Sequence, residues 1–373
     1  MPDKMRFACS KPDRVLYFQK NNDAKGNGMT EDRGRNRRTA ALLISGGVLL
    51  VLFLVSLTLG RFPVPLWDVV RILRHRFWAL FGLSTPVVWT DAMEIAVISV
   101  RLPRVVMACL VGCSLSAAGA TFQGVFRNPM ASPDILGASS GAAFGAALAI
   151  LLGCSARFVT IFAFLGAILT VALVFLISAR APGLRVVNLI LAGIMVGSLF
   201  SAGTSYLKLV ADPANQLPAI TYWLLGSLSG TRLASILPAA IPMALGLVPL
   251  LLLRWRLNLL SLGDSEARAL GVNTDLLRAV LILCATLVTA ASISVSGVIG
   301  WVGLVIPHLS RKLVGSDNRA LLPCSMLTGA AFLLLVDDVS RNLLATEIPI
   351  GILTAVIGAP FFIYLLLRKE KTL

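Results

Sequence analysis

The chain has 373 residues, of which 57% are hydrophobic and only 14% are charged, and its mean hydropathy is +0.85. These values exclude an ordinary water-soluble globular protein and indicate a polytopic membrane protein. The formal net charge of +15 does not point to nucleic acid, since basic residues commonly flank membrane helices on the cytosolic side.

The first 38 residues differ from the rest of the chain. They contain ten Lys or Arg residues and no sustained apolar run, so we predict a disordered cytosolic tail over residues 1–38. The tail is too long and polar for the start of a signal peptide, and Gly60-Arg61 is a poor cleavage site. We therefore expect the first apolar segment to be retained, with Met5 or Met29 as alternative starts.

Ten apolar segments follow, most of them long enough to cross about 30 Å of hydrocarbon. We predict membrane spans at residues 39–60, 95–124, 134–153, 158–179, 188–209, 236–254, 279–300, 302–315, 320–342 and 350–367. The expected fold is therefore an all-α polytopic membrane protein with ten transmembrane helices, forming one domain over residues 39–373. With the N-terminus in the cytosol, most Lys and Arg residues fall on the cytosolic side, which favours both termini inside.

Small residues recur every four positions in three of these spans. The stripes are Gly112/Ser116/Ala120/Gly124, Gly137/Gly141/Gly145 and Gly193/Gly197/Ser201/Ser205. Such a stripe gives a helix a smooth face that a neighbouring backbone can approach closely, and this is the role we expect for the first two. The third could also line a solute path, because two of its members are serines.

Proline-containing runs interrupt the apolar pattern at residues 128–137 and 303–315. Irregular backbone at membrane depth persists only against protein or a wet cavity. We therefore predict broken or re-entrant helices at both places.

Residues 258–278 form a polar island between two apolar runs. Asp264 and Ser265 are typical of a helix start, Gly271 of a left-handed helix end, and Asn273 of the next helix start. The island is either a solvated loop or a docking element for a cytosolic partner.

Enzyme motifs are missing from the sequence. It contains no phosphate-binding G-x-x-x-x-G-K-[ST] loop, and six scattered cysteines with two histidines do not form a metal-binding pattern. Asp337 lies four residues before Arg341, which suggests a local ion pair rather than a coupling carboxylate. We therefore expect a transport subunit that is not an enzyme and has no cofactor or metal site.

Three arginines are expected at the outer ends of their spans: Arg101 and Arg104 in the motif RLPR, and Arg341. Contact with lipid phosphates would explain them. An acidic extracytoplasmic protein would explain them too, since guanidinium groups suit carboxylate partners.

Several long motifs, in order, resemble the permease subunits of type II ABC importers, the family that takes up iron–siderophores, haem and vitamin B12. They are RLPR (101–104), Gln123 with RNPMASPDILGASSGA (127–142), LGDSEARALGVN (262–273), GVIGWVGLVIPHLSRKLVGSDNRALLP (297–323) and EIPIGILTAVIGAPFFIYLLL (347–367). The resemblance covers residues 39–369 and implies ten transmembrane helices in each of two permease subunits, a homodimer or close heterodimer. It also implies a solute path along the dimer axis, two cytosolic ATPase subunits and an extracytoplasmic binding protein.

The resemblance also assigns roles to particular residues. Arg101, Arg104 and Arg341 match arginines that pair with glutamates of the binding protein. The coupling helices that seat in the ATPase are matched by Gly263, Asp264, Ala267, Leu270 and Gly271. The path-lining helix is matched by Gly193, Gly197, Ser201 and Ser205. The cytosolic gate is matched by Ala181, Pro182, Gly183 and Leu184, which depart from the small hydroxyl residues of some members.

The function implied is import of an iron chelate, foremost an Fe(III)–siderophore, across the cytoplasmic membrane of a prokaryote. Corrinoids such as vitamin B12, haem and small oxyanions remain open as cargo. ATP-driven movement of residues 258–278 would produce alternating access. The rivals are an ion-coupled secondary carrier, for which buried coupling carboxylates are not convincing here, and a membrane anchor or sensor.

Overall fold

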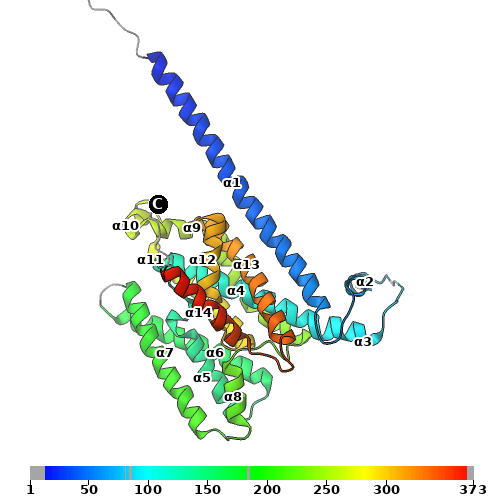
Figure 1. The fold of residues 1–373 in the computed structure, drawn as a ribbon. Helices are drawn as coiled ribbons and strands as arrows, with labels where there is room; N and C mark the ends of the chain where they lie inside the picture. The colour runs from blue at the N-terminus through cyan, green and yellow to red at the C-terminus, as the bar shows by residue number, and fades with distance from the viewer. Residues whose placement is uncertain (1–12, 80, 84–85, 183–184, 368–373) are drawn as a thin grey trace, which may run out of the picture.

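The computed structural model describes residues 13–79, 81–83, 86–182 and 185–367, with side chains left out for residues 13–35, 185 and 365–366. Within these ranges the regular elements are all helices, as the sequence predicts (Figure 1). Seven helices are long and apolar enough to cross a membrane, and two shorter apolar helices accompany them.

Each of the ten predicted spans corresponds to a helix. These are α1 (Asp13–Thr58), α4 (Leu102–Phe126), α5 (Ala138–Leu151), α6 (Ala156–Arg180), α7 (Arg185–Val210), α9 (Leu233–Leu262), α11 (Thr274–Ser296), α12 (Val302–Val314), α13 (Asn318–Asn342) and α14 (Ile350–Leu367). Four short helices join them: α2 (Leu66–Ala79), α3 (Asp91–Glu94), α8 (Gln216–Leu224) and α10 (Asp264–Ala269). Of the expected tail, residues 1–12 lie outside the described residues and residues 13–38 are the beginning of α1, so the structure gives that part as helix.

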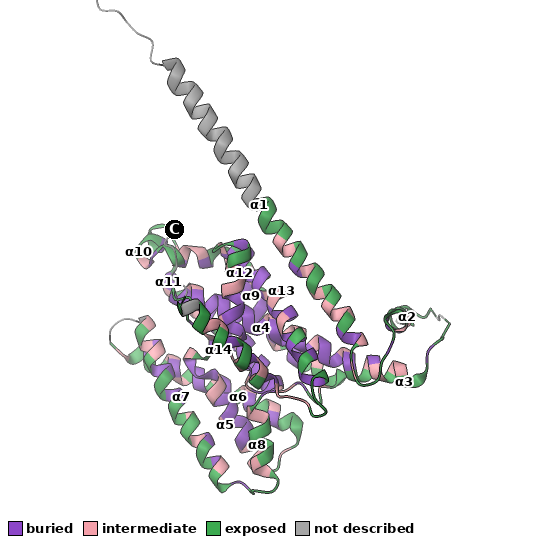
Figure 2. Ribbon diagram, in the orientation of Figure 1, coloured by how far each residue is buried: buried purple, intermediate pink, exposed green. Residues whose placement is uncertain are grey.

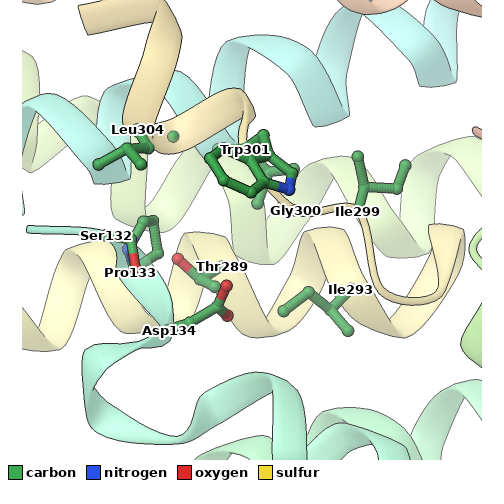
Figure 3. A pocket seen from close by; sticks show the side chains of 11 residues that line it. Ser132, Pro133, Asp134, Thr289, Ile293, Ile299, Gly300, Trp301 and Leu304 are labelled. Carbon is green, nitrogen blue, oxygen red and sulfur yellow. The ribbon is translucent and has the colours of Figure 1, made fainter. Parts of the chain in front are cut away.

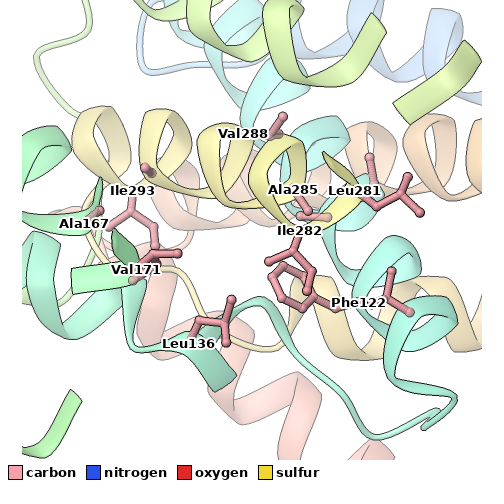
Figure 4. Close-up of a cluster of buried hydrophobic side chains, with 14 of the residues drawn as sticks. Phe122, Leu136, Ala167, Val171, Leu281, Ile282, Ala285, Val288 and Ile293 are labelled. Carbon is pink, nitrogen blue, oxygen red and sulfur yellow. The ribbon is translucent and has the colours of Figure 1, made fainter. Parts of the chain in front are cut away.

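Helix α4 is the centre of the molecule. It contacts α9, α11, α12 and α13. The most apolar 18-residue stretch of the continuous helix Asp91–Phe126, to which α4 belongs, is 78% buried, against 17% for that of Asn36–Thr58 in α1. Its side chain Phe122 belongs to a large apolar cluster with Leu136, Val171 and Leu281 (Figure 4). Buried residues therefore fill the middle of the bundle, whereas the outward faces of α1 and α7 are largely exposed (Figure 2).

Close helix packing is confirmed for the first two small-residue stripes. A Cβ atom placed on Gly112 in α4 would lie 2.3 Å from the carbonyl oxygen of Gly329 in α13. A Cβ atom on Gly141 in α5 would lie 2.4 Å from the carbonyl oxygen of Gly166 in α6. At both crossings backbone meets backbone, which only glycine permits.

The predicted break at residues 128–137 is present. Helix α4 ends at Arg127, which has a positive φ of 50°, and a short 3₁₀ helix, η2 (Pro133–Leu136), ends at Gly137 with φ 73°. The second break differs from the prediction, because α12 continues through Pro307 and the irregular backbone precedes it, at residues 297–301. Pro307 leaves the carbonyl of Gly303 without its usual helical donor, and that carbonyl faces Gly119, where no side chain opposes it.

A wide helical turn precedes α4. Residues Ile95–Arg101 form a π-helix, η1, in which the backbone N–H of Leu102 donates to the carbonyl of Val97, five residues back. Pro103 sits in the first turn of α4, where its missing N–H costs little. The π-turn fixes the direction in which the arginines of RLPR leave the helix axis.

Candidate functional site

The three predicted docking arginines lie together at the end of the bundle where α1 terminates. They form a group that we call the arginine network, made up of Arg101, Arg104 and Arg341 with Asp337, Asp338 and Glu347. Helix α4 supplies Arg104, η1 supplies Arg101, and α13 supplies Arg341 and both aspartates. Residues from distant parts of the sequence thus meet in one cluster with three positive and three negative groups.

Arg104 is held by two carboxylates at once. Its Nε donates to Asp337 Oδ1 and Oδ2 at 3.0 and 3.1 Å, and its Nη1 donates to both oxygens of Glu347 at 2.9 Å. The side chain of Asp337 is 0% exposed, whereas that of Glu347 is 31% exposed. Glu347 is therefore the carboxylate through which water reaches this part of the network.

The other two arginines fasten the end of α1. Arg101 donates to the carbonyls of Leu57 and Thr58 at 2.8 and 3.0 Å, and also to the carbonyl of Phe62. Arg341 donates to the carbonyl of Ser56 at 2.8 Å. Helix ends leave such carbonyls without partners, and the guanidinium groups supply them.

Arg341 also pairs with acids on its own helix. It lies 3.7 Å from Asp337, the predicted i,i+4 pair, and contacts Asp338 more closely. Ser56 bridges the two helices by donating to Asp338 at 2.6 Å. Sequence reasoning missed Ser56 and Glu347 as partners, because Ser56 lies 285 positions from Arg341 and Glu347 lies 243 positions from Arg104.

Burial of the network bears on the expected docking role. Arg101, Arg104 and Arg341 are only 5%, 8% and 9% exposed. Arg104 and Arg341 are paired with carboxylates, whereas among the described residues Arg101 donates only to backbone carbonyls, so a docking partner reaches these side chains only where the network opens. Their contact with a binding protein stays a prediction.

The polar island forms the expected two helices, with one difference at the first helix start. Gly271 has a φ of 79°, and Asn273 caps α11 by accepting from the N–H of Leu276 at 3.0 Å, both as predicted. The residue before α10 is Gly263, however, and neither Asp264 nor Ser265 caps the helix. Gly263 has a φ of 144°, and a Cβ atom there would overlap the carboxylate of Glu266.

Asp264 turns away from α10 because two arginines bind it. Arg127 Nη2 donates to Asp264 Oδ1 at 2.7 Å, and Arg278 Nη2 donates to the same oxygen at 2.9 Å. The hydrogen bond from Arg278 holds the pKa of Asp264 below its ordinary value, and the charges of Arg278 and Arg127 act in the same direction. Asp264 thereby ties α10 to the end of α4 and to α11.

Arg127 is a further residue that sequence reasoning missed. It adopts the left-handed conformation that ends α4, and its Nε donates to the carbonyl of Leu260 at 2.7 Å. Of the other predicted coupling residues, Ala267 is 0% exposed and Leu270 is 62% exposed. Ala267 therefore fixes α10 to the body, and Leu270 is available to a partner.

The predicted path stripe on α7 divides into two halves. Gly193 and Gly197 are buried against η2, and a Cβ atom on Gly193 would lie 2.1 Å from the carbonyl oxygen of Ile135. Ser201 and Ser205 are exposed, and Ser201 Oγ donates to Ser140 Oγ of α5 at 3.2 Å. The glycine half has the packing role, whereas the serine half can line a path.

Only part of the predicted gate is described. Gly183 and Leu184 lie outside the described residues. Ala181 ends α6 in an extended conformation, and Asn188 of α7 donates to the carbonyls of Ala181 and Pro182, each at 3.1 Å. Asn188 thus braces the start of the turn between the two helices.

A small cavity lies between η2, α11 and the irregular segment before α12. Its volume is about 20 Å³, and its polar lining includes Asp134 and Thr289, with Trp301 beside them (Figure 3). A volume of this size holds about one water molecule. This cavity cannot admit a chelate or a corrinoid.

The sequence profile described as the FecCD transport family matches residues 48–368, which is most of the chain. The chain belongs to the FecCD transport family. The protein is accordingly a multi-pass membrane permease of the ABC transporter type, a transport subunit rather than an enzyme.

Individual FecCD relatives agree with this assignment. The molybdate import system permease protein of Haemophilus influenzae is 42% identical over 87% of this chain and 94% of its own length. A probable iron chelatin transport system permease protein of Helicobacter pylori is 45% identical over 75% of this chain and 85% of its own. A solved structure described as a metal-chelate type ABC transporter in an inward-facing conformation has a TM-score of 0.77 at 41% identity, covering 87% of this chain and 98% of that one.

Proposed function

We propose that this FecCD permease is one of two membrane subunits of an ATP-driven importer that carries an iron chelate, foremost an Fe(III)–siderophore, across the cytoplasmic membrane of a prokaryote. The observation that carries the proposal is the likeness to the metal-chelate type transporter, which extends over 98% of that chain. The named cargo of the Helicobacter relative supports an iron chelate. The termini would both lie in the cytosol.

The cargo path would lie between two copies of the chain. The cavity between η2 and α11, of about 20 Å³, is far too small for a chelate, so it is not itself the passage. The exposed serines of α7 support this location, since Ser201 and Ser205 share a helix with exposed Met195, Leu199 and Tyr206. A second copy would cover the apolar side chains and leave the serines to line the passage.

The segment 258–278 would receive the force of ATP hydrolysis from two cytosolic ATPase subunits. Three leucines around α10 support a docked partner here, because Leu262, Leu270 and Leu276 are 59%, 62% and 62% exposed within a polar segment. Asp264, Gly263 and Gly271 would shape and anchor this surface. Movement of α10 would be passed through Arg127 to the end of α4.

The arginine network would be the place where the extracytoplasmic binding protein docks. Glu347, the most exposed carboxylate of the network, pairs with Arg104 in the free chain. Glutamates of a docked protein would compete for the same guanidinium groups. The gate at Ala181–Leu184 would close the opposite end of the passage.

Cargo identity separates the main proposal from its alternatives. A corrinoid such as vitamin B12 and haem are the alternatives within the same importer class, and the Haemophilus relative adds molybdate. Less favoured is an ion-coupled secondary carrier, because the buried acids Asp337 and Asp338 are already paired with arginines.

Uptake measurements test the proposal. The chain is expressed with its cognate ATPase and binding protein in cells that lack other chelate permeases, and accumulation of a radioactive Fe(III)–siderophore, cyanocobalamin, haemin and molybdate is compared. We expect iron accumulation that disappears when the ATPase lacks its Walker lysine. Accumulation by the purified chain alone, driven by an ion gradient, would refute the importer assignment, and preference for another member of the panel would replace the cargo.

A further inference from the structure

Helix α2 has an exposed face that the proposed function does not use. Trp67, Val70, Phe77 and Trp78 are 68%, 38%, 55% and 40% exposed. At 3.6 residues per turn these positions fall on one side of the helix. The opposite side is fixed to the protein through Val69 and Ile72, which are completely buried.

Three aromatic side chains, Phe77, Trp78 and Phe81, gather at the C-terminal end of α2. The ring centroids of Phe77 lie 5.8 Å from those of Trp78 and 5.3 Å from those of Phe81, in edge-to-face contacts. Phe81 is itself 67% exposed. Exposed aromatic residues in a contiguous patch of this kind mark an interaction surface rather than scattered surface residues.

A basic residue, Arg74, accompanies the apolar face. Arg74 is exposed on the same side as Trp67 and Val70, whereas Arg76, on the buried side, pairs with Glu94 at 2.8 Å. Aromatic rings beside arginines are typical of the membrane interface, where rings insert below the headgroups and guanidinium groups bind phosphates. Exposed aromatic rings beside an arginine are not expected on a helix that faces only water.

The position of α2 indicates that lipid covers its exposed face. Figure 1 shows α1 from the side and α2 almost along its axis, so α2 crosses the direction of the spanning helix. Val55, Leu59 and Phe62, at the end of α1 and in the segment that leads to α2, are also exposed apolar residues. In the same view α2 lies at the opposite edge from α7, so a dimer formed through α7 leaves it uncovered.

We propose that α2 lies flat in the membrane interface at the Thr58 end of α1. In this arrangement Trp67, Phe77 and Trp78 insert among the upper parts of the lipid acyl chains, and Arg74 binds phospholipid phosphate. The helix then anchors the connection between α1 and α4. The anchor does not depend on which cargo is carried or on which side of the membrane the termini lie.

Fluorescence quenching in vesicles tests the anchor. The full chain, with every tryptophan except Trp67 or Trp78 replaced by Phe, is reconstituted in phosphatidylcholine/phosphatidylglycerol vesicles containing phosphatidylcholine brominated near the headgroup or near the chain end. We expect strong quenching by the shallow bromines, weaker quenching by the deep ones, and little quenching by aqueous acrylamide. A chain that keeps only Trp89 is the matched control, because that ring is 8% exposed and donates to Glu94, so bromolipid should not quench it.

Other results would overturn the proposal. Strong acrylamide quenching without bromolipid quenching would place the face in water. Protection from both quenchers would show that a protein surface, such as a second copy, covers it. Arg74→Glu should shift the emission of Trp78 to longer wavelength and reduce its bromolipid quenching, and an unchanged signal would refute the phosphate contact.

A second measurement needs no tryptophan variants. The wild-type chain in the same vesicles is photolysed with a phosphatidylcholine that carries a diazirine near the headgroup, and adducts are located by mass spectrometry. We expect adducts on the face containing Trp67 and Phe77. Adducts on α1 with none on α2 would contradict the anchor.

Discussion

Replacing Asp337 by Asn should strongly destabilise the chain, because it removes the completely buried charge of the arginine network. Asp337 accepts two hydrogen bonds from Arg104 and lies 3.7 Å from Arg341. Removing one partner of a buried ion pair typically costs about 3–5 kcal/mol. Since Glu347 and Asp338 still face the two arginines, we expect the lower end, about 3 kcal/mol.

Glu347→Gln is the matched control. It removes the other carboxylate bound to Arg104, but the side chain of Glu347 is 31% exposed and water can replace its hydrogen bonds. Its expected cost is about 1 kcal/mol, close to that of an exposed pair. The double variant Arg104→Gln with Asp337→Asn should lose at least ~1 kcal/mol less than the sum of the two single variants.

The assay is unfolding of the purified chain in mixed micelles by titration with sodium dodecyl sulfate, followed by circular dichroism. The midpoints and slopes give the free energy of unfolding for each variant. If Asp337→Asn unfolds within about 1 kcal/mol of the wild type, or no earlier than Glu347→Gln, the buried network does not stabilise the fold as the geometry indicates.

Three further predictions concern packing, the coupling segment and its dependence on pH. Gly112→Leu should lower the free energy of unfolding by about 2 kcal/mol through overpacking, since even a Cβ atom would lie 2.3 Å from the carbonyl oxygen of Gly329. Gly46→Ala is the control and should not destabilise the chain, because nothing lies within 4 Å of the added Cβ atom. The sodium dodecyl sulfate titration measures both. The lowered folded-state pKa of Asp264 means that its stabilisation is present above the ordinary Asp range and is lost as pH falls through the lowered value. Hydrogen-exchange protection factors over residues 264–271, corrected for the pH dependence of intrinsic exchange, should therefore fall in that pH range in the wild type but not in Asp264→Asn. Ala267→Pro removes the hydrogen bond from the N–H of residue 267 to the carbonyl of Gly263, which should destabilise α10 by about 3 kcal/mol. It should abolish transport while ATP hydrolysis continues. The measurement is the amount of cargo moved per ATP hydrolysed.

Each of these predictions has a clear contrary result. Equal stability of the Gly112 and Gly46 variants would mean that α4 and α13 can separate freely. Exchange over residues 264–271 that follows pH equally with Asn at position 264 would assign the dependence to another group. Normal transport by the proline variant would show that the polar island is only a loop and does not couple ATP hydrolysis to transport.

The helices and their ends could be predicted because their signals are local. Long apolar runs gave the seven described helices that are long enough to cross a membrane, and each of the ten predicted spans corresponds to a helix. Gly271 and Asn273 marked their turn correctly because each acts through its own backbone. The predicted helix start at Asp264 was wrong because its side chain is bound by residues that are distant in the sequence. A carboxylate beside two arginines, Arg127 and Arg278, forms stronger bonds there than it would as a cap.

The surroundings of the predicted site residues could not be obtained from the sequence. Arg104 and Asp337 are 233 positions apart, and their meeting depends on the rotation of α4 and α13 about their axes. The π-helix before Pro103 changes that rotation by inserting one residue into a turn. Spacing could indicate that the arginines lie near a helix end, but not whether they point outward or into the protein.

The way α1 is fastened has a consequence for biogenesis. The carbonyl of Ser56 receives its bond from Arg341, which comes 285 residues later, and the carbonyls of Leu57 and Thr58 depend on Arg101. The carbonyl of Ser56 therefore lacks this donor until nearly the whole chain has been made, whereas those of Leu57 and Thr58 receive theirs once Arg101 has followed. Complete docking of α1 is a late step of assembly, and a chain truncated before α13 would lack its contacts with that helix.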